Sequence, residues 1–114
     1  MLSEITLKEL ILWLSGKRKR FRVAGNSMLP LLKPGEEVLI NPITDQNWQP
    51  QIGDIVVAQH PRQKNLQLIK RVSSVLEDSS YFLEGDNPGE STDSRQFGSV
   101  KREHLIGRVT CRFG

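Results

Sequence analysis

The stretch that decides the fold class is Leu66-Gln67-Leu68-Ile69-Lys70-Arg71-Val72. Side chains of a β-strand point alternately to opposite faces, so one face of this segment carries Lys70 together with three aliphatic residues. Those three are Leu66, Leu68 and Val72, while Gln67, Ile69 and Arg71 take the other face. The segment therefore predicts a strand whose lysine lies on the side that packs against the core.

Other segments on both sides of this stretch have the same character. They are short, rich in Val, Ile and Leu, and separated by Pro, Gly, Asn and Asp. The predicted strands are 21–24, 37–41, 55–59, 66–75, 81–84 and 105–113, with loops expected over 44–51 and 85–98. Many short strands at close spacing predict a mainly β fold, a folded-over antiparallel sheet or small barrel.

One helix is predicted before the first strand. Thr6 and Glu9 have the spacing of a capping box, and Gly16 suits a left-handed C-terminal turn. The apolar residues between them recur at helical spacing on one face: Leu7, Leu10, Ile11 and Leu14. We expect this amphipathic helix to pack on the β body. The predicted organisation is a helix with a basic collar over residues 1–20 and a β domain over 21–114.

Charge is concentrated near the start of the chain. The 114 residues carry 16 Lys and Arg against 13 Asp and Glu, a formal net charge of +3. The basic collar is Lys17-Arg18-Lys19-Arg20 with Arg22 close behind. A nucleic-acid-binding domain usually spreads positive charge along one face, so this distribution disfavours a nucleic-acid partner. An amphipathic helix beside a basic run can instead make weak peripheral contact with an anionic membrane or bind an acidic partner.

Several function classes and compartments are disfavoured by what the sequence lacks. The apolar run from Leu7 to Leu14 is shorter than the roughly 20 residues of a spanning helix, and its positive charges follow it, unlike those of a signal peptide. Cys111 is the only cysteine, and His60 and His104 stand apart, so neither a disulfide nor a metal cluster is indicated. We expect a soluble cytoplasmic protein without a metal or cofactor.

Lys70 is a candidate for proton transfer. Burial disfavours the charged ammonium and lowers a lysine pKa from its usual value of about 10.4. A neutral amine can then accept a proton from a hydroxyl group and activate it as a nucleophile. The alternative is a strand whose register differs by one residue, which leaves Lys70 in solvent.

Two further segments carry groups that suit catalysis. In Gly25-Asn26-Ser27-Met28-Leu29-Pro30, a tight turn can present the Ser27 hydroxyl beside backbone N–H groups that bind an oxyanion. The alternative is a serine that only caps the turn. In the segment 85–95, Asp93 and Arg95 can pair, and Ser91 can hydrogen-bond a buried amine. The alternative for this segment is a solvated surface loop.

In order along the chain, these segments resemble the signal peptidase I family. Four boxes carry the resemblance: 25–30, Gly53-Asp54-Ile55-Val56-Val57, Ile69-Lys70-Arg71-Val72, and Gly85-Asp86-Asn87 followed by residues 91–100. They cover the chain from about Phe21 to Val109. The resemblance implies the family's β fold and a serine endopeptidase that works without a cofactor.

The resemblance also implies a role for each candidate residue. Ser27 aligns with the nucleophile and Lys70 with the general base. Ser91 aligns with a hydroxyl that orients the lysine amine, while Asp93 and Arg95 align with charges that hold its loop. Gly25 stands where some family members place a hydroxyl residue that completes the oxyanion hole. The oxyanion hole would use the backbone N–H of Ser27, and Gly25 and Asn26 are candidate supporting residues. The second oxyanion donor is therefore unassigned.

A narrower resemblance concerns the substrate. The helix with its basic collar, the run 26–35 and the short body resemble the nickel-type superoxide dismutase maturation proteases. That similarity implies a soluble enzyme that removes an N-terminal leader from the dismutase precursor. The main alternative is a general signal peptidase acting at the membrane. A LexA-like autoprotease and a non-enzymatic β module that binds nucleic acid or lipid through residues 17–22 are less favoured.

Overall fold

The computed structural model describes residues 2–43 and 49–113, so most of the loop predicted over 44–51 lies outside the described residues. Within these described residues, six strands form one antiparallel sheet in the order β1-β2-β6-β3-β4-β5. They are β1 Lys19–Arg22, β2 Glu37–Pro42, β3 Ile55–Gln59, β4 Gln67–Val75, β5 Tyr81–Glu84 and β6 Leu105–Phe113. The helical elements are α1 Leu7–Leu14, η1 Pro88–Glu90, α2 Ser94–Phe97 and η2 Arg102–His104. The predicted mainly β fold with one short N-terminal helix is confirmed.

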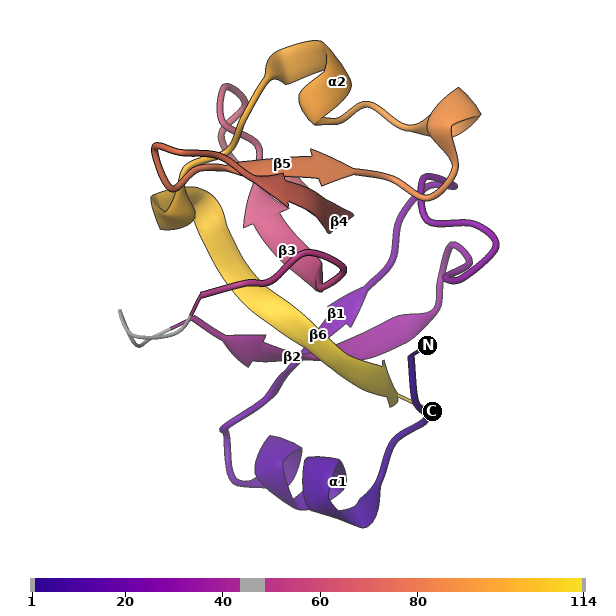
Figure 1. Cartoon of the computed structure of the whole chain (residues 1–114). Coiled ribbons are helices and arrows are strands. Elements are labelled where there is room, and N and C mark those ends of the chain that lie inside the picture. Colours follow the sequence, from indigo (N-terminus) through magenta and orange to yellow (C-terminus); the bar gives the residue numbers. More distant parts are fainter. Residues whose placement is uncertain (1, 44–48, 114) are drawn as a thin grey trace.

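The C-terminal strand β6 joins the two halves of the sheet. It pairs with β2 on one side and β3 on the other, so β1-β2 and β3-β4-β5 are held together by the end of the chain (Figure 1). Two groups of buried apolar residues result. One is built around Met28, Leu32 and Ile69, and the other around Val72, Leu83 and Phe97. The turn that carries Ser27 therefore packs in the first group through Met28, and α2 packs in the second through Phe97.

Strand β4 is covered on both faces in its middle. Ile69 belongs to the first apolar group, whereas Leu68 and Val72 pack with the second. Alternation along an extended strand puts Lys70 on the same face as Leu68 and Val72. The register predicted from the sequence is therefore confirmed, because Lys70 is buried rather than solvated.

The first strand begins earlier than the sequence predicted. It spans Lys19–Arg22 instead of 21–24, because its ladder with β2 runs from Lys19 opposite Ile40 to Arg22 opposite Glu37. Lys19 and Arg20 of the basic collar therefore lie on a strand at the edge of the sheet. Charged side chains on an edge strand are common, since they discourage pairing with another chain.

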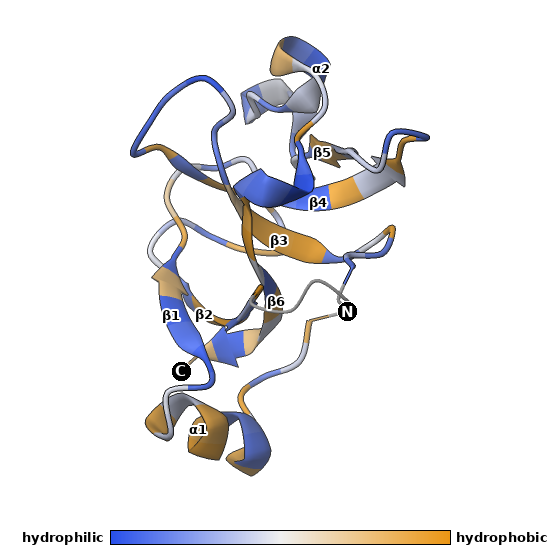
Figure 2. Cartoon of the chain, turned by 90° about the vertical axis from the view of Figure 1, so that its left-hand side faces the viewer, coloured by the Kyte–Doolittle hydropathy of each residue, from blue (hydrophilic) through white to orange (hydrophobic). Residues whose placement is uncertain are grey.

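The predicted packing of the helix stripe on the body is wrong. Of the four apolar residues predicted on one face of the helix, Leu7, Ile11 and Leu14 are exposed, and α1 buries no residue fully. Thr6 does cap the helix by accepting a hydrogen bond from the Glu9 N–H at 3.2 Å. The Glu9 carboxylate completes no capping box, however, since it binds Arg18 and Thr110 instead. Figure 2 shows α1 below the sheet, with hydrophobic residues along much of the helix.

Candidate active site

Lys70 is the central group of the candidate site. Its side chain is 5% exposed, and among the described residues it forms no hydrogen bond or ion pair. Burial lowers the pKa of Lys70 below its ordinary value; the Asp93 carboxylate opposes this shift and Arg95 adds to it. A buried amine with a lowered pKa and no fixed partner is suited to accept a proton.

Ser27 lies in the turn that follows β1. The turn starts at Gly25, whose φ of +78° is a conformation that other residues rarely adopt. This backbone explains why glycine, and not a hydroxyl residue, occupies that position. Ser27 itself is 9% exposed. Among the described residues, its backbone N–H donates no hydrogen bond, which leaves it available to an oxyanion.

The segment after β5 holds the serine turn in place. The Asn87 backbone N–H donates to the Ser27 carbonyl oxygen at 2.8 Å. The Asn87 side-chain amide donates to the Asn26 carbonyl oxygen at 3.1 Å. Asn26 therefore contributes through its backbone, and two hydrogen bonds fix the turn against the segment that begins at Gly85.

Gly85 is the point at which the separate parts of the site meet. The register between β4 and β5 pairs Arg71 with Glu84, so the next position along the ladder places Gly85 beside Lys70. A Cβ atom built on Gly85 would collide with the Ser91 hydroxyl oxygen and lie 2.6 Å from the Ser27 carbonyl oxygen. Only a residue without a side chain lets these three segments approach one another this closely.

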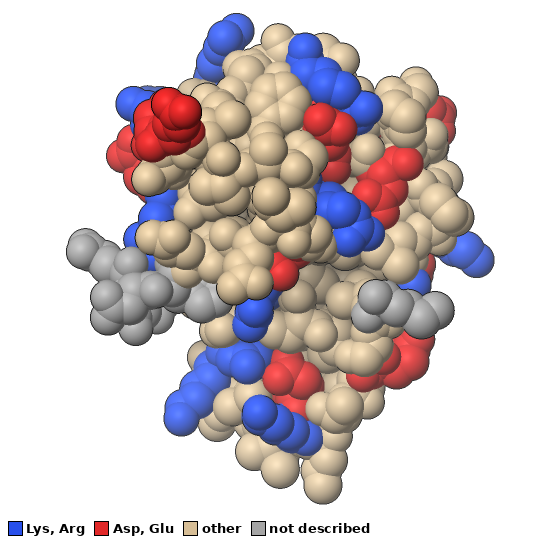
Figure 3. Space-filling model, viewed as in Figure 1, with Lys and Arg blue, Asp and Glu red and all other residues tan. Residues whose placement is uncertain are grey.

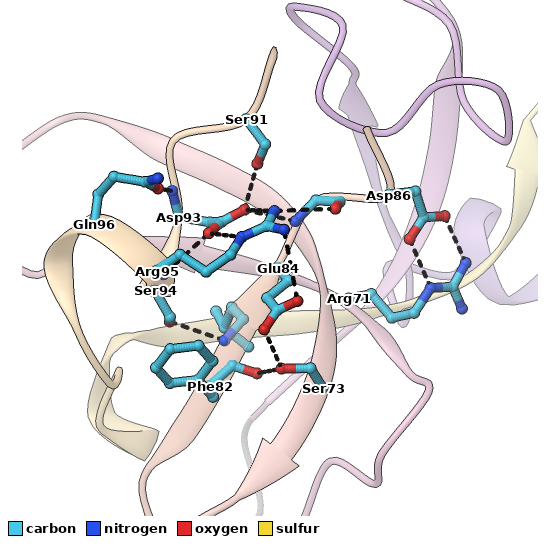
Figure 4. A network of polar contacts seen from close by, with 12 residues as sticks. Arg71, Ser73, Phe82, Glu84, Asp86, Ser91, Asp93, Ser94, Arg95 and Gln96 are labelled. Atoms are coloured by element: carbon cyan, nitrogen blue, oxygen red, sulfur yellow. Dashed lines mark hydrogen bonds and ion pairs between the residues drawn. The ribbon is translucent and has the colours of Figure 1, made fainter. Parts of the chain in front are cut away.

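Asp93 organises the loop behind the site, as Figure 4 shows. Its carboxylate is fully buried and accepts hydrogen bonds from the Ser91 hydroxyl at 2.5 Å, the Gly85 N–H at 2.9 Å and the Arg95 guanidinium at 2.6 Å. Asp93 also caps α2, with Gln96 completing a capping box. Burial raises the pKa of Asp93, but these hydrogen bonds outweigh it and hold the pKa well below its ordinary value.

The predicted pairing of Asp93 with Arg95 is thus present, and the segment is not a merely solvated loop. Ser91 uses its proton on Asp93, which leaves its oxygen lone pairs for another donor. Among the described residues, no hydrogen bond joins Lys70 to Ser91 or to Ser27. The structure brings the segments of Ser27, Lys70 and Ser91 together around Gly85, while their catalytic roles stay predictions.

A second ion pair braces the neighbouring face. Arg71 donates to both carboxylate oxygens of Asp86, at 2.9 and 2.8 Å, and to the Gly53 carbonyl oxygen at 2.9 Å. The bidentate pair ties β4 to the segment after β5 (Figure 4), and the separate bond to Gly53 ties β4 to the segment before β3. No role had been predicted for Arg71, Asp86 or Gly53, nor for Gly85 and Asn87, although all of them lie in the segments that resemble the family. Arg71 lies within β4, and Gly85, Asp86 and Asn87 directly follow β5, but neither place in the sequence reveals what these residues contact.

Fold and site together define a small antiparallel β protein in which a buried lysine and two serine-bearing segments meet, the layout of a candidate serine hydrolase. The family model "Signal peptidase, peptidase S26" matches residues 7–76 and 73–113. The chain belongs to this signal peptidase family.

Individual relatives agree with the family. Mitochondrial inner membrane protease subunit 2 of Danio rerio is 33% identical over 110 residues, covering 78% of this chain and 60% of the relative. Mitochondrial ATP-independent inner membrane protease subunit 1b of Arabidopsis thaliana is 34% identical over 110 residues, covering 77% of this chain and 65% of the relative. Probable signal peptidase I-1 of Synechocystis sp. is 25% identical over 134 residues, covering 80% and 68%.

The chain spans less than two thirds of the length of the two mitochondrial relatives. Among the described residues, none of the helices has the length and apolar character needed to cross a membrane.

Proposed function

We propose that this chain is a serine endopeptidase that removes an N-terminal leader from a precursor protein, with Ser27 as nucleophile and Lys70 as general base. The observation that carries the proposal is the burial of an unpaired Lys70 next to Gly85, the residue on which the Ser27 and Ser91 segments converge. Membership of the signal peptidase family supports the same reaction class.

In the proposed mechanism, neutral Lys70 takes the proton of the Ser27 hydroxyl as its oxygen attacks the scissile carbonyl. The negative oxygen of the tetrahedral intermediate is stabilised by the Ser27 N–H. Collapse of the intermediate forms an acyl-enzyme, and the Lys70 ammonium returns its proton to the departing amine. Lys70 then activates a water molecule that hydrolyses the ester. Asp93 and Arg95 act as positioning residues, since they hold the loop that carries Ser91.

Two precursor classes fit this reaction. The printed names of the relatives refer to an inner membrane protease and to a signal peptidase, which favours leader removal at a membrane surface. The run 26–35 supports the second candidate, a nickel-type superoxide dismutase precursor processed in the cytoplasm. Mass measurement after incubation with each class of leader-bearing precursor separates them, because only the true substrate is shortened at one bond.

The dyad is tested by substitution. Ser27→Ala and Lys70→Ala should each abolish cleavage of a leader-bearing precursor, whereas Lys64→Ala, which changes an exposed lysine, should not. Cys111→Ala should also leave cleavage intact, because burial raises the pKa of the Cys111 thiol and keeps it a poor nucleophile. The cleavage rate should level off well below pH 10. Full activity of Lys70→Ala would refute the dyad.

A further inference from the structure

The outward face of α1 is apolar and uncovered. Leu7, Ile11 and Leu14 are 72%, 55% and 70% exposed. At about 3.6 residues per turn, positions i, i+4 and i+7 form one continuous stripe along a helix. We call these three residues the α1 stripe. A contiguous stripe of aliphatic side chains in solvent marks an interaction surface rather than scattered surface leucines.

The opposite face of α1 is fixed to the sheet, so the stripe cannot turn inward. The Glu9 carboxylate accepts hydrogen bonds from Arg18 at 3.0 Å and from the Thr110 hydroxyl at 2.5 Å. The Trp13 ring packs edge-on against Phe113 with centroids 4.7 Å apart. Glu9 and Trp13 lie four positions apart on one side of the helix, away from the stripe. Their contacts commit the stripe to face outward.

Three exposed lysines lie on α1 or within five residues of its C-terminal end. Lys8 lies on α1 beside the stripe, and Lys17 and Lys19 follow the helix; all three are exposed. They form no ion pair within the described residues. The arginines of the collar behave differently, since Arg18 pairs with Glu9, and Arg20 pairs with Glu37 while lying over the Phe113 ring. Figure 3 shows uncharged surface at the end of the molecule formed by α1, bordered by Lys and Arg side chains with acidic side chains among them.

We propose that α1 docks the protein on the surface of an anionic lipid bilayer, with the α1 stripe inserted at the headgroup level and the three lysines against the lipid phosphates. Aliphatic burial and electrostatic attraction are each weak and act together in such peripheral helices. A second copy of this chain is a poorer occupant, because pairing two stripes brings their lysines together. The proposal does not rest on the peptidase function, since no catalytic residue takes part.

The test is flotation of the full chain with phospholipid vesicles. One set holds phosphatidylglycerol and phosphatidylcholine in equal parts, and the other phosphatidylcholine alone. We expect binding to the anionic set that weakens as salt is raised, and at least about tenfold weaker binding to phosphatidylcholine. The double substitution Ile11→Gln/Leu14→Gln should weaken anionic binding at least about tenfold, and Lys17→Gln about fivefold.

Ile52→Gln is the matched control. Ile52 is 67% exposed but lies between β2 and β3, so its loss should leave binding unchanged. Ser27→Ala should also bind fully, which separates failure of this proposal from failure of the proposed catalysis. All variants change exposed or turn residues. Vesicle binding is compared only among variants whose thermal unfolding transition matches that of the wild type. The proposal is overturned if the wild type does not float with anionic vesicles, if the double variant floats equally, or if sedimentation reveals a dimer that the double variant dissolves.

Discussion

At the scale of single residues, the burial of Lys70 is energetically unfavourable. A buried amine is destabilising in its charged form, and Lys70 has no hydrogen bond or ion pair among the described residues to offset the loss of water. Proteins keep such groups mainly where chemistry needs them, so stability and activity should respond in opposite directions to its removal. The strand alternation was enough to predict this burial, because its signal lies within seven consecutive residues.

Replacement of this lysine by an apolar side chain should stabilise the fold. We expect Lys70→Met to raise the free energy of unfolding at pH 7, because burial lowers the Lys70 pKa and so makes folding of the protonated lysine unfavourable. The unfolded chain binds the extra proton up to its pKa of about 10.4. The wild type therefore gains stability as pH rises toward that value, and the advantage of Lys70→Met shrinks.

Urea unfolding of both proteins between pH 7 and 10 measures this difference. Lys64→Met, at an exposed lysine, should show neither the gain nor its pH dependence. A Lys70→Met protein less stable than the wild type at pH 7 would mean that Lys70 is charged and well paired. Its cleavage activity should be lost in either case.

At the scale of elements, the site depends on how closely three segments approach at Gly85. Sequence alone could not assign this role, because the residues that a Cβ would meet, Ser27 and Ser91, come from turns on either side of β2, β3 and β4. The helix itself was predicted correctly, but the packing of its apolar stripe was mispredicted for a related reason. A stripe at helical spacing indicates that one face is apolar, but only the contacts of Glu9 and Trp13 decide which face meets the sheet.

Gly85→Ala should damage both stability and catalysis. The added methyl group must displace the Ser91 hydroxyl or the Ser27 carbonyl, and overpacking of this kind costs about 1–3 kcal/mol. We expect a lower thermal transition and a fall in the cleavage rate of at least tenfold, since the turn that carries Ser27 shifts with its carbonyl.

Gly89→Ala is a control from the same segment. A Cβ atom on Gly89 meets no atom within 4 Å, and this glycine lies in η1 rather than at the junction. Its transition temperature and activity should therefore match the wild type. Equal behaviour of the two alanine variants would show that the segments can separate at little cost.

At the scale of the whole molecule, the chain consists of a sheet with two packed apolar groups and a helix attached by a few polar and ring contacts. The two apolar groups share β6 and the middle of β4, so the sheet should unfold as one unit. Helix α1 buries none of its residues fully. Its attachment should open at a lower free energy than the sheet, as is usual for elements with few buried contacts.

The carboxylate of Glu9 is the group on which that attachment most depends. Burial raises the Glu9 pKa, but hydrogen bonds from Thr110 and Arg18 outweigh this and leave the pKa below its ordinary value. The stabilisation is therefore fully present above the unfolded pKa of about 4.3 and is lost as pH falls through the lowered pKa of the folded state. Glu9→Gln should produce the same loss at neutral pH.

Hydrogen exchange measured by mass spectrometry tests this coupling. In Glu9→Gln, amides of residues 10–17 should exchange about tenfold faster or more, since a hydrogen bond to a charged group contributes about 1.5–3 kcal/mol. Amides of β3, β4 and β6 should keep their protection. Glu4→Gln is the matched control, because Glu4 is 70% exposed and its oxygen lies 3.7 Å from Arg112. If β6 lost protection together with α1, helix and sheet would form one cooperative unit, and the stripe on α1 would be held by the whole fold rather than by Glu9.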